Sequence, residues 1–389
     1  MKKLFAFALS LFIMVSCGTA PKEIQVGALS FDEYLPLLEG KRVSILSNQT
    51  GMVSSTTHLL DTLLDMGVNV VSIMSPEHGF RGVADAGEHV SSSIDEATGI
   101  PIRSLYESGV NRPSDESMAE FDVMVFDLQD VGVRFYTYNA TMARMMDACA
   151  QFGKKMIVLD RPNPLGYYVD GPILDMQYKS GVGWLPVPVV HGMTLGELAL
   201  MINGEGWLKD GIQCDLTVVP CKNYSRDMEY VLPIKPSPNL PNMKSIYLYP
   251  STCYFEATPV SLGRGTDKPF QIYGHPDMTG YEFSFTPRSV PGAKNPPQLD
   301  KLCYGVDLSG LTDEEIKAEG INLEYVIDAY NNLKLDDKKM FRSFFELLIG
   351  QKYVREMIVE GKSADEIEAM WADDVVKFKE QRAPYLIYE

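Results

Sequence analysis

The sequence predicts an α/β protein in which a mostly parallel sheet with helices forms one domain and a smaller α+β domain packs on it. From Lys41 to about Pro220, short β-branched runs alternate with segments of helical periodicity, which is the pattern of strands joined by helices. After Pro220 the sequence becomes rich in Pro, Tyr and Asn, and helical periodicity returns only toward the C-terminus. The length of 389 residues also favours two domains over one.

Short runs of apolar and β-branched residues are the predicted strands of the sheet. Helices between them are predicted by apolar residues at the i, i+3, i+4, i+7 spacing of a one-faced helix. Gly67 and Gly153 stand where a helix C-cap would precede the next strand. The strands cover residues 43–46, 68–74, 122–127, 156–159 and 216–219, and the helical faces are Met142, Met145, Met146 and Cys149, then Leu195, Leu198, Ala199 and Ile202.

The second domain begins after a Pro-rich segment. The sequence KPSPNLPN at residues 235–242 predicts a long ordered loop, and residues 251–311 predict short strands and loops. Three helices follow near residues 323–333, 341–359 and 364–382, and Ser363 and Glu366 have capping-box spacing at the start of the last. We therefore predict a sheet domain at residues 24–250 and a smaller domain at residues 251–389.

The first 17 residues are predicted to be a targeting segment. Lys2 and Lys3 precede an apolar stretch at residues 4–15 that is too short to span a bilayer, and a small residue precedes Cys17. Met-Val-Ser-Cys is similar to a bacterial lipoprotein signal, in which the cysteine is lipidated and becomes the new N-terminus. We expect an exported, periplasmic protein that contacts the membrane only through a lipid on Cys17; the alternative is a plain secretory signal.

The composition limits the function further. The net charge of -17 argues against a nucleic-acid partner, because phosphate binding needs clustered Lys and Arg. The five cysteines after Cys17 are an odd number without CxxC spacing, so we expect buried small side chains and assign no metal site. The first strand is followed by SNQTGM instead of GxGxxG, and the chain has no phosphate-loop, GxSxG or HExxH motif. We therefore predict no cofactor.

Polar residues follow four consecutive predicted strands. Asn48 and Gln49 follow the first strand, and the other three strands are followed by residues 75–82, 127–134 and 160–163. Because ligands bind beyond the carboxyl ends of parallel strands, these loops predict a site at one rim of the sheet.

The same loops carry motifs that resemble those of the exo-β-N-acetylmuramidase family. The resemblance runs from about Lys41 to the closing YLIY. The motifs are SPEHGFRG (75–82), AGEHV (86–90), FDLQDVGVRFYTY (126–138), LDRPNPLG (159–166), HGMTLGEL (191–198), PSPNLPN (236–242) and GRGTDKPF (263–270). The resemblance implies a Rossmann-like catalytic domain, a smaller C-terminal domain and an active-site cleft between them.

The activity implied by the resemblance is release of N-acetylmuramic acid from the non-reducing end of peptide-free peptidoglycan glycans. The glutamate of the family's PEHG motif matches Glu77. The chain departs from the family elsewhere: AGDEV reads AGEHV, EGTN reads Glu256-Ala-Thr-Pro, and SEGRGT reads SLGRGT. The second glutamate of AGDEV is thus replaced by His89, which argues against a required role at that position.

Glycoside hydrolysis needs a proton donor for the leaving oxygen and a group that traps or stabilises the sugar cation. Glu77 is the predicted general acid, with His78 to tune it; the alternatives are a helix cap, a salt bridge to Arg81, or a structural histidine. The second group is Asp130, Glu88 or the substrate's own acetamido oxygen. Asp130 is equally consistent with a structural role that orients Arg134.

The other predicted site residues are substrate contacts. An arginine would grip the lactyl carboxylate that distinguishes muramic acid from glucosamine. Tyr136 alternates with Tyr138 and would stack on the sugar, although core packing is the alternative. The candidate contacts are Arg81, Glu88, Arg134, Tyr136, Asp160, Arg161, Asn163, His191, Asn239 and Arg264, and each has a structural alternative such as an ion pair or a loop brace.

Two rival functions fit the same sequence. A non-catalytic sugar-binding lipoprotein would use the same cleft, and it predicts glycan binding that survives Glu77→Gln without turnover. A structural envelope protein would use the polar loops to bind another protein.

Overall fold

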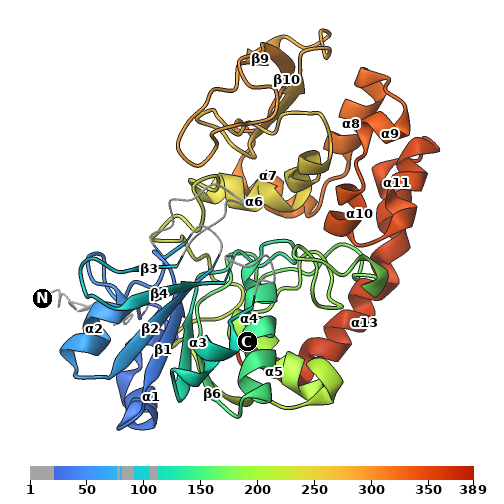
Figure 1. Cartoon of the computed structure of the whole chain (residues 1–389). Coiled ribbons are helices and arrows are strands. Elements are labelled where there is room, and N and C mark those ends of the chain that lie inside the picture. The colour runs from blue at the N-terminus through green and yellow to red at the C-terminus, as the bar shows by residue number, and fades with distance from the viewer. Residues whose placement is uncertain (1–21, 77–78, 81–91, 106–111) are drawn as a thin grey trace, which may run out of the picture.

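The computed structural model describes residues 22–76, 79–80, 92–105 and 112–389. A mostly parallel sheet with helices forms one part, and an antiparallel sheet with further helices forms a smaller second part (Figure 1). The predicted fold class is therefore confirmed. None of the helices in these ranges is long and apolar enough to cross a membrane.

The larger sheet has seven strands in the order β3-β4-β2-β1-β5-β6-β7. All neighbours pair in parallel except β3 and β4, which are antiparallel. The five predicted strands are confirmed to within two residues, whereas β3 and β4 were not predicted. The strands are β1 (Val43–Ser47), β2 (Val70–Ser75), β3 (Ser93–Ile94), β4 (Pro101–Ser104), β5 (Val123–Asp127), β6 (Lys155–Leu159) and β7 (Asp215–Val219).

Helices cover both faces of this sheet, which is why its central strands are apolar at nearly every position. Val123 and Val125 of β5 pack in one core cluster, and Met124 and Phe126 pack in the other. The first cluster contains residues of α1 (Phe31–Leu38) and α2 (Leu59–Asp65). The second contains residues of α3 (Asp115–Ala119), α4 (Tyr138–Gln151) and α5 (Leu195–Gly204), where the two predicted helical faces are confirmed as buried.

The smaller part begins at α6 (Met243–Thr252) and contains a three-stranded antiparallel sheet in the order β8-β10-β9. The short strands predicted within residues 251–311 are confirmed as β8 (Ile272–His275), β9 (Phe283–Phe285) and β10 (Cys303–Asp307). The helices that follow are α7 (Asp313–Glu319), α8 (Glu324–Leu333), α9 (Asp337–Met340), α10 (Phe344–Ile349), α11 (Lys352–Val359), α12 (Ala364–Glu368) and α13 (Ala372–Arg382).

Two predicted helices are each divided in the structure, and one helix was not predicted. The helix predicted over residues 364–382 is α12 and α13, with a 3-10 turn at Ala369–Trp371 between them. The helix predicted over residues 341–359 is two helices, because Gly350 has a φ of 82° and ends α10 in the left-handed conformation. Helix α6 was not predicted, although Asn242 and Ser245 form a capping box at its start and Pro250 lies in its last turn. The capping box predicted at Ser363 is present, and Thr194 and Glu197 form another at the start of α5.

The end of the chain returns to the larger part. Helix α13 runs back from the smaller part toward the sheet (Figure 1), and the hydroxyl of Tyr388 donates to Asp160 Oδ2 at 2.6 Å. Glu197 Oε1 accepts hydrogen bonds from the main-chain N–H groups of Ile387 and Tyr388. The two parts are thus joined by packed contacts as well as by the connecting chain.

The five cysteines after Cys17 are buried and unbridged, as the sequence predicts for small core side chains.

Candidate active site

The loops after β1 and β5 meet at the carboxyl ends of the strands. The amide and hydroxyl of Thr50 both donate to Asn48 Oδ1, at 2.9 and 2.6 Å, and the amide of Gln129 donates to Thr50 Oγ1 at 3.1 Å. Asn48 Nδ2 in turn donates to the hydroxyl of Tyr138 at 2.6 Å. The polar residues after these two strands therefore form one connected network, next to the start of α4.

Asp130 is the described candidate with the geometry of an acid or base. Its Oδ2 accepts a hydrogen bond from the amide of Gly132 at 2.7 Å, and Oδ1 has no hydrogen-bond partner within the part of the chain that the structure describes. Burial raises the pKa of Asp130 to about 7. A carboxyl group of this kind exchanges a proton near neutral pH, and perturbed groups of this kind gather at functional sites.

The turn that holds Asp130 is fixed by a close approach to Asn163. Gly132 has a φ of 83°, and a Cβ atom built on it would lie 2.1 Å from Asn163 Oδ1. Asn163 Nδ2 donates to the carbonyl of Met193 at 2.9 Å, and its Oδ1 accepts from the amide of Leu165. In this structure Asn163 braces the turn around Asp130.

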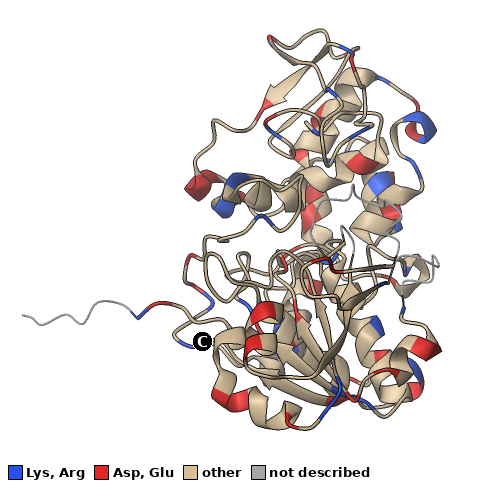
Figure 2. Ribbon diagram, turned by 60° about the vertical axis from the view of Figure 1, so that its left-hand side comes forward, with Lys and Arg blue, Asp and Glu red and all other residues tan. Residues whose placement is uncertain are grey.

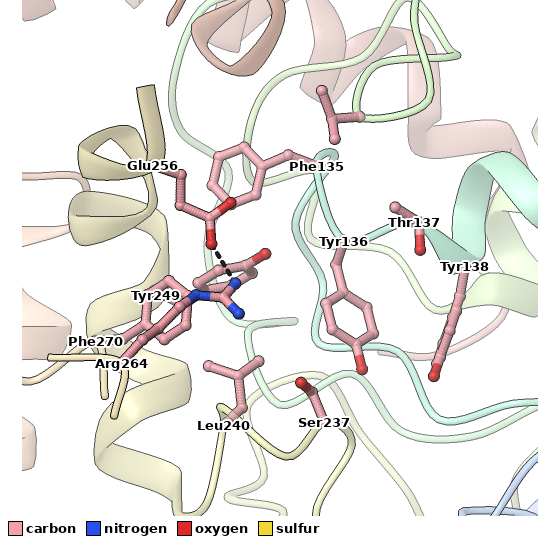
Figure 3. A pocket seen from close by; sticks show the side chains of 11 residues that line it. Phe135, Tyr136, Thr137, Tyr138, Ser237, Leu240, Tyr249, Glu256, Arg264 and Phe270 are labelled. Carbon is pink, nitrogen blue, oxygen red and sulfur yellow. Dashed lines mark hydrogen bonds and ion pairs between the residues drawn. The ribbon is translucent and has the colours of Figure 1, made fainter. Parts of the chain in front are cut away.

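A cavity of about 80 Å³ lies between the start of α4 and the smaller part of the molecule. Figure 3 shows aromatic rings around it and the guanidinium of Arg264 paired with the carboxylate of Glu256. Arg264 also lies over the ring of Phe270, 5.3 Å from its centroid. The lining residues are Phe135, Tyr136, Thr137, Tyr138, Val182, Ser237, Leu240, Tyr249, Glu256, Arg264 and Phe270.

Tyr136 connects this cavity to the Pro-rich loop. Its hydroxyl donates to the carbonyl of Pro236 at 2.7 Å, and its ring lies edge-on to that of Tyr138 at 4.8 Å. The carboxyl group of Asp130 adds to the electrostatic effects that raise the pKa of Tyr136, after burial and Tyr138. Tyr136 and Tyr138 therefore line the cavity, and Asp130 lies close enough to Tyr136 to act on it electrostatically.

Arg134 is fully buried, and its partners are main-chain carbonyls. Nη1 donates to Pro172 and Val187 at 2.8 and 2.7 Å, and Nη2 donates to Leu348 and Ile349 at 3.0 and 2.8 Å. The last two belong to α10, so Arg134 joins the two parts of the molecule. This geometry favours the structural alternative for Arg134.

Arg161 and Asp160 are also occupied by buried contacts. Arg161 Nε donates to Asp127 at 2.6 Å, in an ion pair whose side chains are 4% and 0% exposed. Asp160 accepts from the hydroxyls of Thr194 and Tyr388 and from the amide of Gly196, at the start of α5. Burial raises the pKa of Asp160 to about 6 despite these donors. Both residues brace the loop after β6 in this structure.

His191 and Asn239 occupy different places. His191 is buried, its Nδ1 accepts from the amide of Met193 at 3.2 Å, and burial lowers its pKa to about 3, so the ring is neutral. Asn239 Nδ2 donates to the carbonyl of Gly292 at 2.8 Å and ties the Pro-rich loop to the smaller part. Glu77, His78, Arg81, Glu88 and Cys17 lie outside the described residues.

Sequence reasoning missed most of the lining residues and one positioning residue. Tyr249, Glu256 and Phe270 line the cavity, and the last two lie in segments compared with family motifs. His58 caps α2: Nδ1 accepts from the amide of Leu60, and Nε2 lies 2.7 Å from the carbonyl oxygen of Asn48, so Nε2 carries the proton. A histidine just before an apolar helical run was the available signal.

The chain matches two family models, described as exo-beta-N-acetylmuramidase NamZ, N-terminal, over residues 43–244, and C-terminal, over residues 247–388. It is 38% identical over 373 residues to the peptidoglycan beta-N-acetylmuramidase NamZ of Bacillus subtilis, covering 92% of this chain and 89% of that protein. Two crystal structures of DUF1343 family proteins from Bacteroides fragilis are similar. The first has a TM-score of 0.88 and is 61% identical, with 95% of this chain and 99% of the other covered. The second has a TM-score of 0.78 and is 30% identical, with 94% of this chain and 99% of the other covered.

Proposed function

The chain belongs to the exo-β-N-acetylmuramidase family, and on this premise we propose that it releases N-acetylmuramic acid from the non-reducing end of peptide-free peptidoglycan glycans during cell-wall turnover. The resemblance stated from the motifs is thereby confirmed at the level of family, and the chain is a glycoside hydrolase that acts on peptidoglycan. The end of the glycan, the role of each residue and the cellular task are our proposals.

The observation that carries the proposal is the cavity with a charged pair at its wall. Figure 2 shows acidic residues spread over both parts of the molecule with basic residues between them, so an anionic sugar needs a local cation. Among the predicted arginines that the structure describes, Arg134 and Arg161 are held in buried contacts, whereas Arg264 lines the cavity. We assign Arg264 to the lactyl carboxylate, with the surrounding aromatic rings against the sugar.

Asp130 is the described residue that fits proton transfer. In the proposed reaction the glycosidic oxygen gains a proton as its bond to the anomeric carbon breaks, and water finally adds to that carbon. A carboxyl with a pKa of about 7 can donate or accept a proton at neutral pH. Glu77 remains our predicted general acid, and Asp130 is the second group.

The test incubates the purified mature protein with the disaccharide N-acetylmuramyl-β-1,4-N-acetylglucosamine and with its chitobiose analogue. We expect release of N-acetylmuramic acid from the first and little turnover of the second. Glu77→Gln and Asp130→Asn should each lower kcat at least about 100-fold, the usual contribution of a general acid or base. Saturable glycan binding without turnover by the wild type would favour the non-catalytic alternative.

The role of Arg264 is tested by the selectivity for muramic acid. Arg264→Met should lower kcat/KM for the muramyl disaccharide at least about 30-fold, because a charge-assisted bidentate contact is lost, without a matching loss for chitobiose. Arg288→Met is the control, because Arg288 pairs with Asp300 at an exposed position. Equal losses for both disaccharides would contradict a role in reading the carboxylate.

We also propose that the protein is exported and anchored by a lipid on Cys17, on the basis of the sequence alone. A Cys17→Ser variant should then move from the membrane fraction to the soluble fraction of cells. A wild-type protein already in the soluble fraction would contradict the anchor.

A further inference from the structure

We propose that a groove beside the cavity is the aglycone subsite, which holds the second sugar of the glycan as an uncharged N-acetylhexosamine. The inference rests on the proposed function and adds the direction in which the glycan lies. The groove is bordered by Gln49 after β1, by Pro238 of the Pro-rich loop and by Pro233 and Ile234 just before that loop. Pro291 of the smaller part lies on its other side.

The groove is next to the cavity and larger than it. Ser237 lines both spaces, and their volumes are about 500 Å³ for the groove and about 80 Å³ for the cavity. A space of several hundred Å³ is the usual size of a small-molecule site, so the groove is large enough for a sugar of its own. A glycan that places its terminal residue against the cavity therefore has room for the next residue along the groove.

The walls of the groove suit an uncharged sugar. Proline rings and Ile234 form most of the surface, and Lys235 is the one charged residue among its described lining residues. A hexosamine offers the C–H groups of one ring face and an acetamido methyl group, which gain free energy by leaving water for such a surface. The charged Arg264–Glu256 pair lies in the cavity, so the two spaces differ in the sugar that they favour.

Gln49, at the wall of the groove, has a side-chain oxygen that could accept a hydrogen bond from a sugar. Gln49 Nε2 donates to the carbonyls of Lys235 and Pro236 at 3.2 and 3.3 Å, which is at the long end of the range for N–H···O hydrogen bonds. Its Oε1 is buried and has no hydrogen-bond partner within the described part of the chain. A buried acceptor without a donor costs roughly 1–3 kcal/mol, and the N–H of an acetamido group or a sugar hydroxyl would satisfy it after a small rotation.

The groove is held in shape without a ligand. The Pro-rich loop is tied to the strand ends by Gln49 and by the Tyr136 hydroxyl, and to the smaller part by Asn239, which donates to the carbonyl of Gly292 at 2.8 Å. Gly292 has a φ of 83°, and a Cβ atom there would lie 2.5 Å from Pro238 Cβ. The two walls are thus in close contact, and a preformed groove binds with a smaller entropy loss.

The test compares a ligand that needs the groove with one that does not. We measure kcat/KM for the muramyl disaccharide and the inhibition constant of free N-acetylmuramic acid, which fills only the terminal site. Ile234→Asp puts a charge on the apolar wall and should lower kcat/KM for the disaccharide at least about tenfold, with the inhibition constant unchanged within about twofold. Val231→Asp is the matched control, because Val231 lies on the same loop, is 63% exposed and is outside the groove.

The outcomes separate the two proposals. If the wild type cleaves the disaccharide and Ile234→Asp cleaves it equally well, the subsite is overturned and the proposed function stays intact. The same holds if Val231→Asp loses as much kcat/KM for the disaccharide as Ile234→Asp does. A wild type that releases no N-acetylmuramic acid overturns the proposed function itself. If Ile234→Asp no longer binds N-acetylmuramic acid, the milder Ile234→Ala is judged by the same two measurements, with an expected loss of about three- to tenfold.

Discussion

Asp130, our proposed second catalytic group, lowers the stability of the folded protein where its carboxyl group is charged. Its carboxyl group is buried, one of its oxygens has no partner within the described residues, and its pKa is raised from 3.8 to about 7. The folded state therefore keeps a proton between about pH 4 and pH 7 that the unfolded state has released. Stability contributed by this group falls as the pH rises through that window and is lowest above pH 7.

We predict that Asp130→Asn stabilises the protein, and more so at high pH, because the amide carries no charge that burial penalises. The gain should be larger at pH 8.5 than at pH 5.5 by about 2 kcal/mol, an order-of-magnitude value from the pKa shift. Urea unfolding at the two pH values measures it. Asp215→Asn, at an exposed position, should show no such pH dependence. A gain that is the same at both pH values would mean that Asp130 is not protonated in the folded state.

At this scale the sequence predicted which residues gather but not what they bind. The strand-end rule brought Asn48, Gln129 and Asp130 to one rim, as the hydrogen bonds between their loops show. It could not separate Arg134 from Arg264 as candidates. The partners of Arg134 are main-chain carbonyls, and two of them lie more than 200 positions away in the chain. A sequence pattern carries no record of such contacts.

Among the secondary-structure elements, α5 depends on the end of the chain. Thr194 and Glu197 cap its first turn, Asp160 accepts from the amide of Gly196, and Tyr388 completes this arrangement by donating to Asp160. The amide of Cys221 donates to the same Tyr388 hydroxyl at 2.8 Å. The start of α5, the loop after β6 and the second residue after β7 are therefore joined through one phenol.

We predict that Tyr388→Phe destabilises the protein by about 1–3 kcal/mol, because the amide of Cys221 then lacks an acceptor and Asp160 lacks a donor. Denaturant unfolding measures this loss. The control is Tyr385→Phe, which removes the same atom from a hydroxyl that donates to Glu205 at the surface and should cost less than about 0.5 kcal/mol. Equal effects of the two changes would show that the contact with Asp160 adds nothing to stability.

The elements themselves were predicted where their apolar pattern is regular. The buried strands β1, β5 and β6, the edge strand β7 and the helices α4, α5 and α8 have such patterns. Helix α6 was missed because it follows a Pro-rich loop and contains Pro250, which sequence rules treat as a helix breaker. The break at Gly350 was missed because apolar residues continue on both sides of it. At α6 tertiary packing outweighs the local preference, whereas at Gly350 the C-cap glycine was a local signal that the continuing apolar pattern obscured.

For the whole molecule, Arg134 is one of the contacts that hold the sheet part and the smaller part together. We predict that Arg134→Lys destabilises the protein by at least about 3 kcal/mol, because an ammonium with three donors cannot reach the four carbonyls that the planar guanidinium serves. Thermal unfolding measures the loss. A variant that keeps the wild-type stability but loses substrate affinity would instead support the predicted role in binding substrate.

The arrangement of the two parts was the least predictable feature, because it depends on contacts between residues distant in sequence. The fold class of each part followed from periodicity, and the motifs indicated the family. The cavity, however, is built from the start of α4, the Pro-rich loop and the smaller part together. No single segment of the chain carries the pattern of such a site.

The two ends of the described chain meet at neighbouring residues. Gln25 exchanges main-chain hydrogen bonds with Lys222, and Tyr388 binds the amide of Cys221. A chain whose ends lie together can be joined there by a short linker and opened at an exposed loop elsewhere without moving its packed elements. The contacts between the packed elements therefore define this fold, and the position of the two chain ends does not.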